Sequence, residues 1–245
     1  MSSRLKRQAT ITRFMKLLRL ACFVAASFCL LRNVHGQGFV NLDFEDAVII
    51  PVPSSPYYPY AVYASDAIPG WTILPGNDLG TNEITYNDLS LGSTAIALLG
   101  TDNHFGPDSL DGNYSISLYG GIFAGAASIS QTGVVPALTE SIFFEAQGGG
   151  GTLQLSLGGQ TIPFFALSTG ANYTLYGGSI PSNFSGQSEQ LVLSASEQGG
   201  NNFWEIDDIQ FSPLAVPEPS VLGLLALGGL FFGLIRFKRR AAKLV

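Results

Sequence analysis

Aromatic rings gather in one proline-rich stretch of the chain. Residues 51–63 contain four prolines and four tyrosines, namely Pro51, Pro53, Pro56, Pro59, Tyr57, Tyr58, Tyr60 and Tyr63. Four prolines preclude a central β-strand, so this stretch is predicted to be an exposed or wrapping loop. Sugar sites stack exposed rings on pyranose faces beside polar side chains. Tyr57, Tyr58 and Tyr60 are therefore candidate glycan contacts, and the alternative is that they cover the edge of a sheet.

The sequence contains few residues that could serve in nucleophilic catalysis or bind zinc. A second polar and aromatic loop is formed by Asn103, His104, Phe105 and Asp108, and His104 is the one histidine after residue 36. No Gly-x-Ser-x-Gly motif accompanies it, and one histidine does not hold zinc without further nitrogen or thiolate ligands. Both cysteines, Cys22 and Cys29, precede residue 36. We therefore interpret His104 as a loop residue.

A glycosidase needs only two carboxylates roughly 5–10 Å apart. Residues 205–210 read Glu-Ile-Asp-Asp-Ile-Gln, which is similar to the Glu-x-Asp-x-x-Glu motif of laminarinase-like glycosidases. The last position, the general acid/base in that family, is Gln210 here, and the motif falls in the final predicted strand instead of mid-domain. The sequence therefore predicts a non-catalytic protein, with a glycosidase as an alternative.

Charge divides the 245-residue chain into three blocks. Residues 1–36 contain seven Lys or Arg and no acid, residues 37–214 contain seventeen Asp or Glu and no Lys or Arg, and residues 215–245 contain five basic residues and Glu218. A middle block without Lys or Arg excludes nucleic-acid binding, because phosphates must be neutralised. It also excludes phosphate-loop and Schiff-base lysine chemistry.

The first block, 1–36, has the pattern of a signal peptide. A basic stretch precedes the uncharged run 20–31, and small residues follow, which predicts export and cleavage before Gln37. The run is too short to span a membrane comfortably. Translation from Met15 would give a more ordinary leader than translation from Met1, and both starts stay open.

The third block, 215–245, has the order of a sorting signal. Val216-Pro217-Glu218-Pro219 precedes an uncharged run, 221–235, and a basic tail, 236–245. A helix over the run would span about 22 Å, short of the roughly 30 Å hydrocarbon core, and the basic tail would stay cytoplasmic. This order resembles the PEP-CTERM sorting signal of Gram-negative bacteria that make exopolysaccharide. The resemblance implies processing near Pro-Glu-Pro by a membrane-embedded exosortase, and the alternative is an ordinary membrane anchor.

The middle block, 37–214, is predicted to be one all-β domain without a long helix. Short alternations of apolar and polar residues recur between Gly-rich turns, and about ten such strands favour a sandwich or barrel. The predicted strands are 39–45, 84–86, 94–99, 114–119, 127–132, 141–147, 153–157, 161–167, 173–177, 190–196 and 204–207. Gly158-Gly159 predicts a tight hairpin between residues 152–157 and 160–167.

Four short segments resemble galactose-binding-like jelly rolls in their order along the chain. They are 41–45 (Asn-Leu-Asp-Phe-Glu), 68–71 (Ile-Pro-Gly-Trp), 111–114 (Asp-Gly-Asn-Tyr) and 204–209 (Trp-Glu-Ile-Asp-Asp-Ile). The resemblance implies a jelly-roll-like sandwich whose first and last strands lie close together. Glu45 with Asp207 or Asp208 would then supply oxygen ligands for a structural calcium ion. The alternative is a set of solvated acids at strand ends.

These observations predict an exported β-sandwich, either anchored at the cell envelope by its C-terminal helix or released after processing. We expect a non-catalytic module that binds exopolysaccharide or forms part of it, with an exosortase-type enzyme as its processing partner. Exposed aromatic rings favour glycan binding. An acidic, Ser/Gly-rich surface that calcium bridges would instead favour a self-associating matrix protein.

Overall fold

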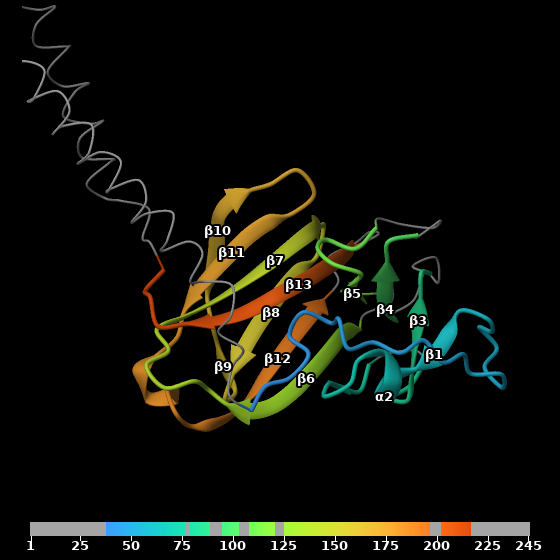
Figure 1. Cartoon of the computed structure of the whole chain (residues 1–245), viewed down its shortest axis with the longest axis horizontal. Coiled ribbons are helices and arrows are strands. Elements are labelled where there is room, and N and C mark those ends of the chain that lie inside the picture. The colour runs from blue at the N-terminus through green and yellow to red at the C-terminus, as the bar shows by residue number, and fades with distance from the viewer. Residues whose placement is uncertain are drawn as a thin grey trace, which may run out of the picture.

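The chain folds as a sandwich of two β-sheets, as the sequence predicts (Figure 1). The computed structural model describes residues 38–76, 79–88, 95–102, 108–120, 125–196 and 202–216. The larger sheet has the strand order β1 (Ala61–Tyr63), β3 (Glu83–Tyr86), β4 (Ala95–Gly100), β5 (Tyr114–Gly120), β13 (Asn202–Ser212), β7 (Ser141–Gly149), β11 (Thr174–Ser179) and β10 (Phe164–Thr169). The smaller sheet has the order β2 (Thr72–Ile73), β6 (Ala126–Val134), β12 (Ser188–Ser196), β8 (Thr152–Leu157) and β9 (Gln160–Thr161).

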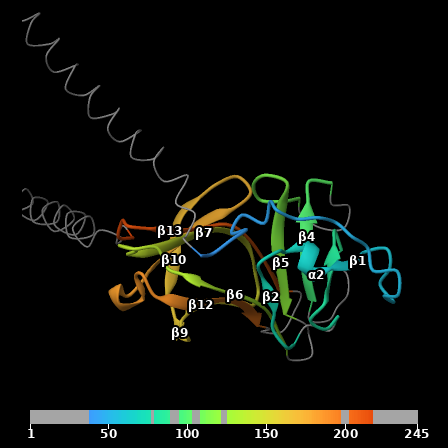
Figure 2. The ribbon, with the colours of Figure 1, turned by 60° about the horizontal axis from the view of Figure 1, so that its bottom comes forward.

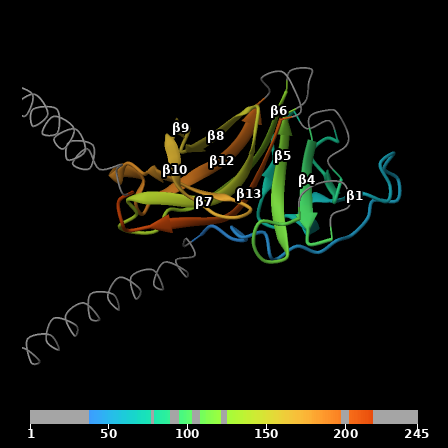
Figure 3. The same ribbon diagram turned by 90° about the horizontal axis from the view of Figure 1, so that it is seen from above.

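Helical structure is short in the part of the chain that the structure describes. It consists of one turn, α2 (Ala64–Ala67), and a 3₁₀ turn, η2 (Ser182–Phe184). All strand pairs are antiparallel except β3 with β4. Figures 2 and 3 turn the molecule so that β7 and β13 separate from β6 and β12 as two layers.

Alternation along the strands builds the core between the layers. In β5, Ile116 and Leu118 belong to the core, while Ser115 and Ser117 lie on the other face of the sheet, as the period of two requires. The buried members of the core cluster all lie between Phe39 and Phe211. Residues 38–216 therefore contain their own hydrophobic core, and we treat them as the folding unit.

The prediction that residues 39–45 form the first strand is wrong. Asn41 and Phe44 take left-handed φ values of 49° and 56°, so the segment forms turns. Trp71 Nε1 donates to the Asn41 carbonyl at 2.9 Å, and the Phe44 ring stacks on Trp71 at 5.6 Å between centroids. The turn thus buries Phe44 completely. The expected closeness to the last strand is confirmed, because Ile209 N–H donates to the Leu42 carbonyl at 3.0 Å.

The expected strand 161–167 is two strands. The chain leaves the smaller sheet after β9 and enters the larger sheet at β10. Pro163 stands between them, and a proline has no N–H to donate to a ladder. The predicted Gly158-Gly159 turn does join β8 to β9, with φ values of 57° and 78° that glycine tolerates.

Candidate functional site

The prediction of a loop over residues 51–63 is wrong at its end, where Ala61–Tyr63 form the edge strand β1. The stretch before β1 is a closed loop, and we call residues 52–60 the tyrosine loop. Val52 N–H donates to the Ala61 carbonyl at 2.9 Å and closes its base. Three turns order its interior, through hydrogen bonds from the N–H groups of Ser55, Tyr58 and Tyr60 to the carbonyls of Val52, Ser55 and Tyr57. Figures 1 and 3 show the segment projecting from one end of the molecule. The loop is therefore ordered by its own backbone.

Two of the three tyrosines of this loop are exposed to solvent. Tyr58 is 58% exposed, Tyr60 is 40% exposed, and Tyr57 is partly buried. The Tyr60 carbonyl accepts a hydrogen bond from Tyr86 N–H in β3 at 2.8 Å, which ties the loop to the larger sheet. The structure thus brings all three predicted residues together. Contact of these rings with a glycan stays a prediction.

Glu45, a predicted calcium ligand, holds the turn 111–114. Its Oε1 accepts the N–H groups of Asn113 at 2.6 Å and Tyr114 at 2.9 Å, and its Oε2 accepts Asn113 Nδ2 at 2.7 Å. Gly112 turns the chain with φ of 59°, and a Cβ at this position would collide with Glu45 Oε1. Glu45 therefore acts as an anchor for this turn.

Asp207 accepts hydrogen bonds from the same turn. Its Oδ2 accepts Asp111 N–H at 3.2 Å, and its Oδ1 accepts Asp208 N–H at 2.8 Å. Burial raises the pKa of Asp207 to about 9, these two hydrogen bonds oppose the rise, and the neighbouring Asp208 and Glu145 add to it. Asp208 has a left-handed φ of 45° at a bulge in β13, and its Oδ2 accepts Gln210 Nε2 at 2.7 Å.

We call Glu45, Asp207 and the turn 111–114 the acidic corner. Every carboxylate oxygen of Glu45 and Asp207 already faces an N–H donor, whose positive end repels a cation. Among the described residues, no three or more His, Cys, Asp or Glu gather as a metal site. Calcium binding at Glu45, Asp207 and Asp208 therefore stays a prediction.

A buried carboxylate on β13 has partners that the sequence analysis missed. Glu205 has no exposed surface, Ser115 Oγ donates to its Oε1, and Gln147 Nε2 donates to its Oε2 at 2.7 Å. Burial raises its pKa, and these two hydrogen bonds oppose the rise. The network ties β5, β13 and β7 together. The serines that alternate with the core residues of β5 were the one sequence feature that could have indicated a polar partner for Glu205.

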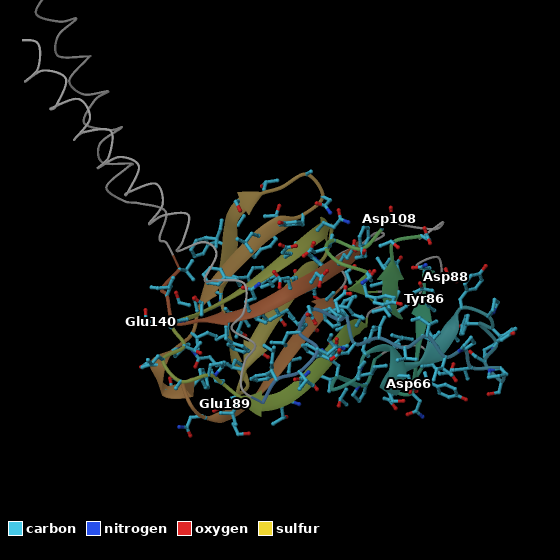
Figure 4. The ribbon with its side chains drawn as sticks, viewed as in Figure 1. Asp66, Tyr86, Asp88, Asp108, Glu140 and Glu189 are labelled. Carbon is cyan, nitrogen blue, oxygen red and sulfur yellow. The ribbon has the colours of Figure 1, made fainter. Side chains whose placement is uncertain are left out.

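The second predicted aromatic loop lies mostly outside the described residues. Asn103, His104 and Phe105 lie outside the described residues, so the reading of His104 stays a prediction. Asp108 is described, and Figure 4 shows it along the upper side of the molecule, away from Glu140.

The sorting signal begins where the chain is still held by the sandwich. Ser141 Oγ donates to the Leu214 carbonyl at 2.6 Å, and Val216 is buried. The rest of the predicted motif, Pro217, Glu218 and Pro219, and the run 221–235 lie outside the described residues. No helix in the described part of the chain is long and apolar enough to cross a membrane.

Comparison with protein families identifies the C-terminal segment. Residues 215–240 match the PEP-CTERM protein-sorting motif. The chain therefore carries the predicted sorting signal, which indicates an exported protein sorted to the cell envelope. No curated protein matches the sequence.

Three solved structures share similarity with the chain. A cyclase from Fischerella sp. TAU, in complex with 4-(1H-indol-3-yl)butan-2-one, is 17% identical with a TM-score of 0.44, covering 72% of this chain and 96% of the cyclase. TmCBM61 in complex with β-1,4-galactotriose is 13% identical with a TM-score of 0.36, covering 72% and 98%. The enzymatically active domain of bacteriophage CBA120 tailspike protein 4 is 15% identical with a TM-score of 0.36, covering 59% and 19%.

Proposed function

We propose that this protein is a non-catalytic module that binds polysaccharide outside the cell through its tyrosine loop. The observation that carries the proposal is the exposure of Tyr58 and Tyr60 on a loop that is ordered by its own hydrogen bonds. The substrate class is an uncharged or cationic polysaccharide, because the domain has no Lys or Arg with which to bind an anionic one.

The order of the loop favours binding over a covering role. Rings that only covered a sheet edge would lose most of their exposed surface, whereas Tyr58 and Tyr60 keep a large part of theirs. A tyrosine presents a large apolar area with few rotatable bonds. Because the loop backbone is already held by turns, little conformational entropy remains to be lost when a sugar stacks on its rings.

The sorting signal supplies the location at which such binding is useful. We propose that an exosortase-type membrane enzyme recognises Pro217-Glu218-Pro219 and the run behind it, and leaves the sandwich at the envelope or in the extracellular matrix. Val216 is packed on the sandwich, so cleavage after this residue would leave the folded domain intact.

A depletion assay with residues 38–216 tests the proposal. The protein is incubated with a panel of polysaccharides, including the exopolysaccharide of its source organism, and the unbound fraction is measured. We expect one glycan to deplete the wild type, and Tyr58→Ala or Tyr60→Ala to weaken that binding by about tenfold or more. Tyr63→Ala is the matched control, since Tyr63 is 39% exposed but lies on β1, outside the loop. Equal losses in all three variants, or no binding to any glycan, would overturn the proposal.

A further inference from the structure

The two sheets of the sandwich have four edges, and one of them differs from the rest. The edge strands β2 and β9 contain two residues each, and β1 contains three, with an isolated bridge from Pro51 to Val62 on its outer side. The fourth edge strand, β10, contains six residues. In the described part of the chain β10 pairs with β11 alone. A long edge strand offers backbone N–H and C=O groups to another strand.

This edge lacks the side chains that usually protect one. Natural edge strands carry charged residues or proline, and residues 164–169 of β10 contain neither. Phe165, Ala166, Ser168 and Thr169 are exposed. The one protective feature within the strand is a β-bulge between Ala166 and Ser168, and pairing with β11 continues on both sides of it.

The edge also lies in a neutral part of an acidic domain. Residues 146–188 contain no Asp, Glu, Lys or Arg, and β8, β9, β10 and β11 all fall within this range. Two copies of a domain with seventeen acids and no Lys or Arg repel each other across most of their surfaces. This repulsion is screened beyond about 8 Å at physiological salt, so a neutral edge is where two copies approach at least cost.

We propose that β10 pairs antiparallel with β10 of a second copy of this chain about a twofold axis. The same strand then serves both partners, as a closed symmetric dimer requires, and the two larger sheets continue into each other. Charge favours a second copy of this chain as the partner of β10, because a Lys-rich partner would instead bind to the acidic surfaces of the domain.

The pairing has a consequence for the tyrosine loop. β1 and β10 are the opposite edges of the larger sheet, and Figure 1 shows them at opposite ends of the molecule. A dimer joined at β10 therefore carries its two tyrosine loops at its far ends. If the loops bind polysaccharide, a point that rests on the function proposed above, the dimer crosslinks two chains.

Sedimentation of residues 38–216 over a range of concentrations tests the pairing. We expect the wild type to dimerise, and the Ala166→Lys/Ser168→Lys double variant to weaken dimerisation by about tenfold or more through like charges across the interface. The matched control is Gln160→Lys/Thr161→Lys, which adds the same charge to the exposed two-residue edge β9. A wild type that stays monomeric up to about 1 mM, or a control that weakens dimerisation equally, would overturn the proposal.

Hydrogen exchange of the wild type is a second test of the interface, and it does not depend on whether a variant folds. Amides of β10 should exchange more slowly as protein concentration rises, while those of β9 should not change. Unchanged exchange along β10 in a dimer would place the interface elsewhere. The Tyr57→Ala/Tyr58→Ala/Tyr60→Ala variant should still dimerise. A wild type that dimerises but binds no glycan would therefore count against the tyrosine loop and not against this edge.

Discussion

Replacing Glu45 with alanine is expected to destabilise residues 38–216 by about 3 kcal/mol. Its carboxylate accepts three hydrogen bonds, two from the backbone N–H groups of Asn113 and Tyr114 and one from the Asn113 side chain. A hydrogen bond to a charged group contributes about 1.5–3 kcal/mol. We take about 1 kcal/mol for each, because Glu45 is partly exposed and water replaces part of what is lost.

Glu45→Gln separates the hydrogen bonds from the charge. The glutamine oxygen still accepts both backbone N–H groups, while its NH₂ group faces the Asn113 amide, whose oxygen accepts from it after a flip. We therefore expect a smaller loss, about 1 kcal/mol. Both variants are compared with the wild type by urea denaturation, followed through the fluorescence of Trp71 and Trp204.

The same experiment shows whether Glu45 acts as an anchor for the turn 111–114 or as a calcium ligand. If Glu45 acts through the turn 111–114, the order of stability and the size of the losses are the same in EDTA and in millimolar calcium. A loss of stability below about 0.5 kcal/mol for Glu45→Ala would refute the role of Glu45 as an anchor, since that is less than the contribution of one net hydrogen bond. A wild type that melts higher in calcium, with a gain that Glu45→Ala abolishes, would instead support the calcium site predicted from the sequence.

Three further variants probe the same corner and the buried network. Gly112→Ala should cost about 1–2 kcal/mol because of its φ of 59° and its collision with Glu45, and less in the Glu45→Ala background; equal costs in the two backgrounds would contradict the contact. Asp207 has a pKa of about 9 in the folded state against an ordinary 3.8, so the folded state keeps a proton that the unfolded chain releases. Stability should then fall by about 1.4 kcal/mol per unit between about pH 6 and pH 8 in the wild type and lose this slope in Asp207→Asn; parallel slopes by urea denaturation would show that Asp207 is ionised. Ser115→Ala should cost about 1–3 kcal/mol by leaving Glu205 Oε1 without its donor, whereas Ser117→Ala should cost little, because Ser117 Oγ has no partner in the described structure; similar melting points would contradict this.

Acids without cations are the main electrostatic feature of this domain. Glu45, Asp207, Asp208 and Glu205 accept hydrogen bonds from backbone N–H groups, amides and a hydroxyl, and no Lys or Arg occurs between residues 37 and 214. Burial raises the pKa of Glu205 and of Asp207 although both carboxylates accept hydrogen bonds. The acidic side chains therefore serve structure at these positions.

Local alternation predicts the strands of this fold well, because a half-buried strand must alternate. The pattern over residues 114–119 became β5, and that over 190–196 became part of β12. The same kind of pattern failed at 39–45, where Trp71, some thirty residues away, holds Asn41 and Phe44 in left-handed conformations. A contact between distant segments decided that backbone, and no local pattern encodes it.

The candidate site also has a part that the sequence predicts and a part that depends on contacts between distant segments. Proline content predicted the tyrosine loop from its own residues, because a proline-rich stretch cannot enter a central strand. The partners of Glu205 depend on which residues of β5 and β7 face it across the sheet, and that register follows from the packed core. Glu45 likewise meets the turn 111–114 only once both ends of the domain have packed.

Affinity electrophoresis tests the central claim most directly. Residues 38–216 and the Tyr57→Ala/Tyr58→Ala/Tyr60→Ala variant are run through gels that contain the exopolysaccharide of the source organism, beside a gel without it. The tyrosine loop predicts that the polysaccharide retards the wild type and that the variant migrates as in the empty gel. Equal retardation of both proteins would place glycan binding elsewhere on the sandwich, and retardation of neither would remove this polysaccharide as the ligand of the loop.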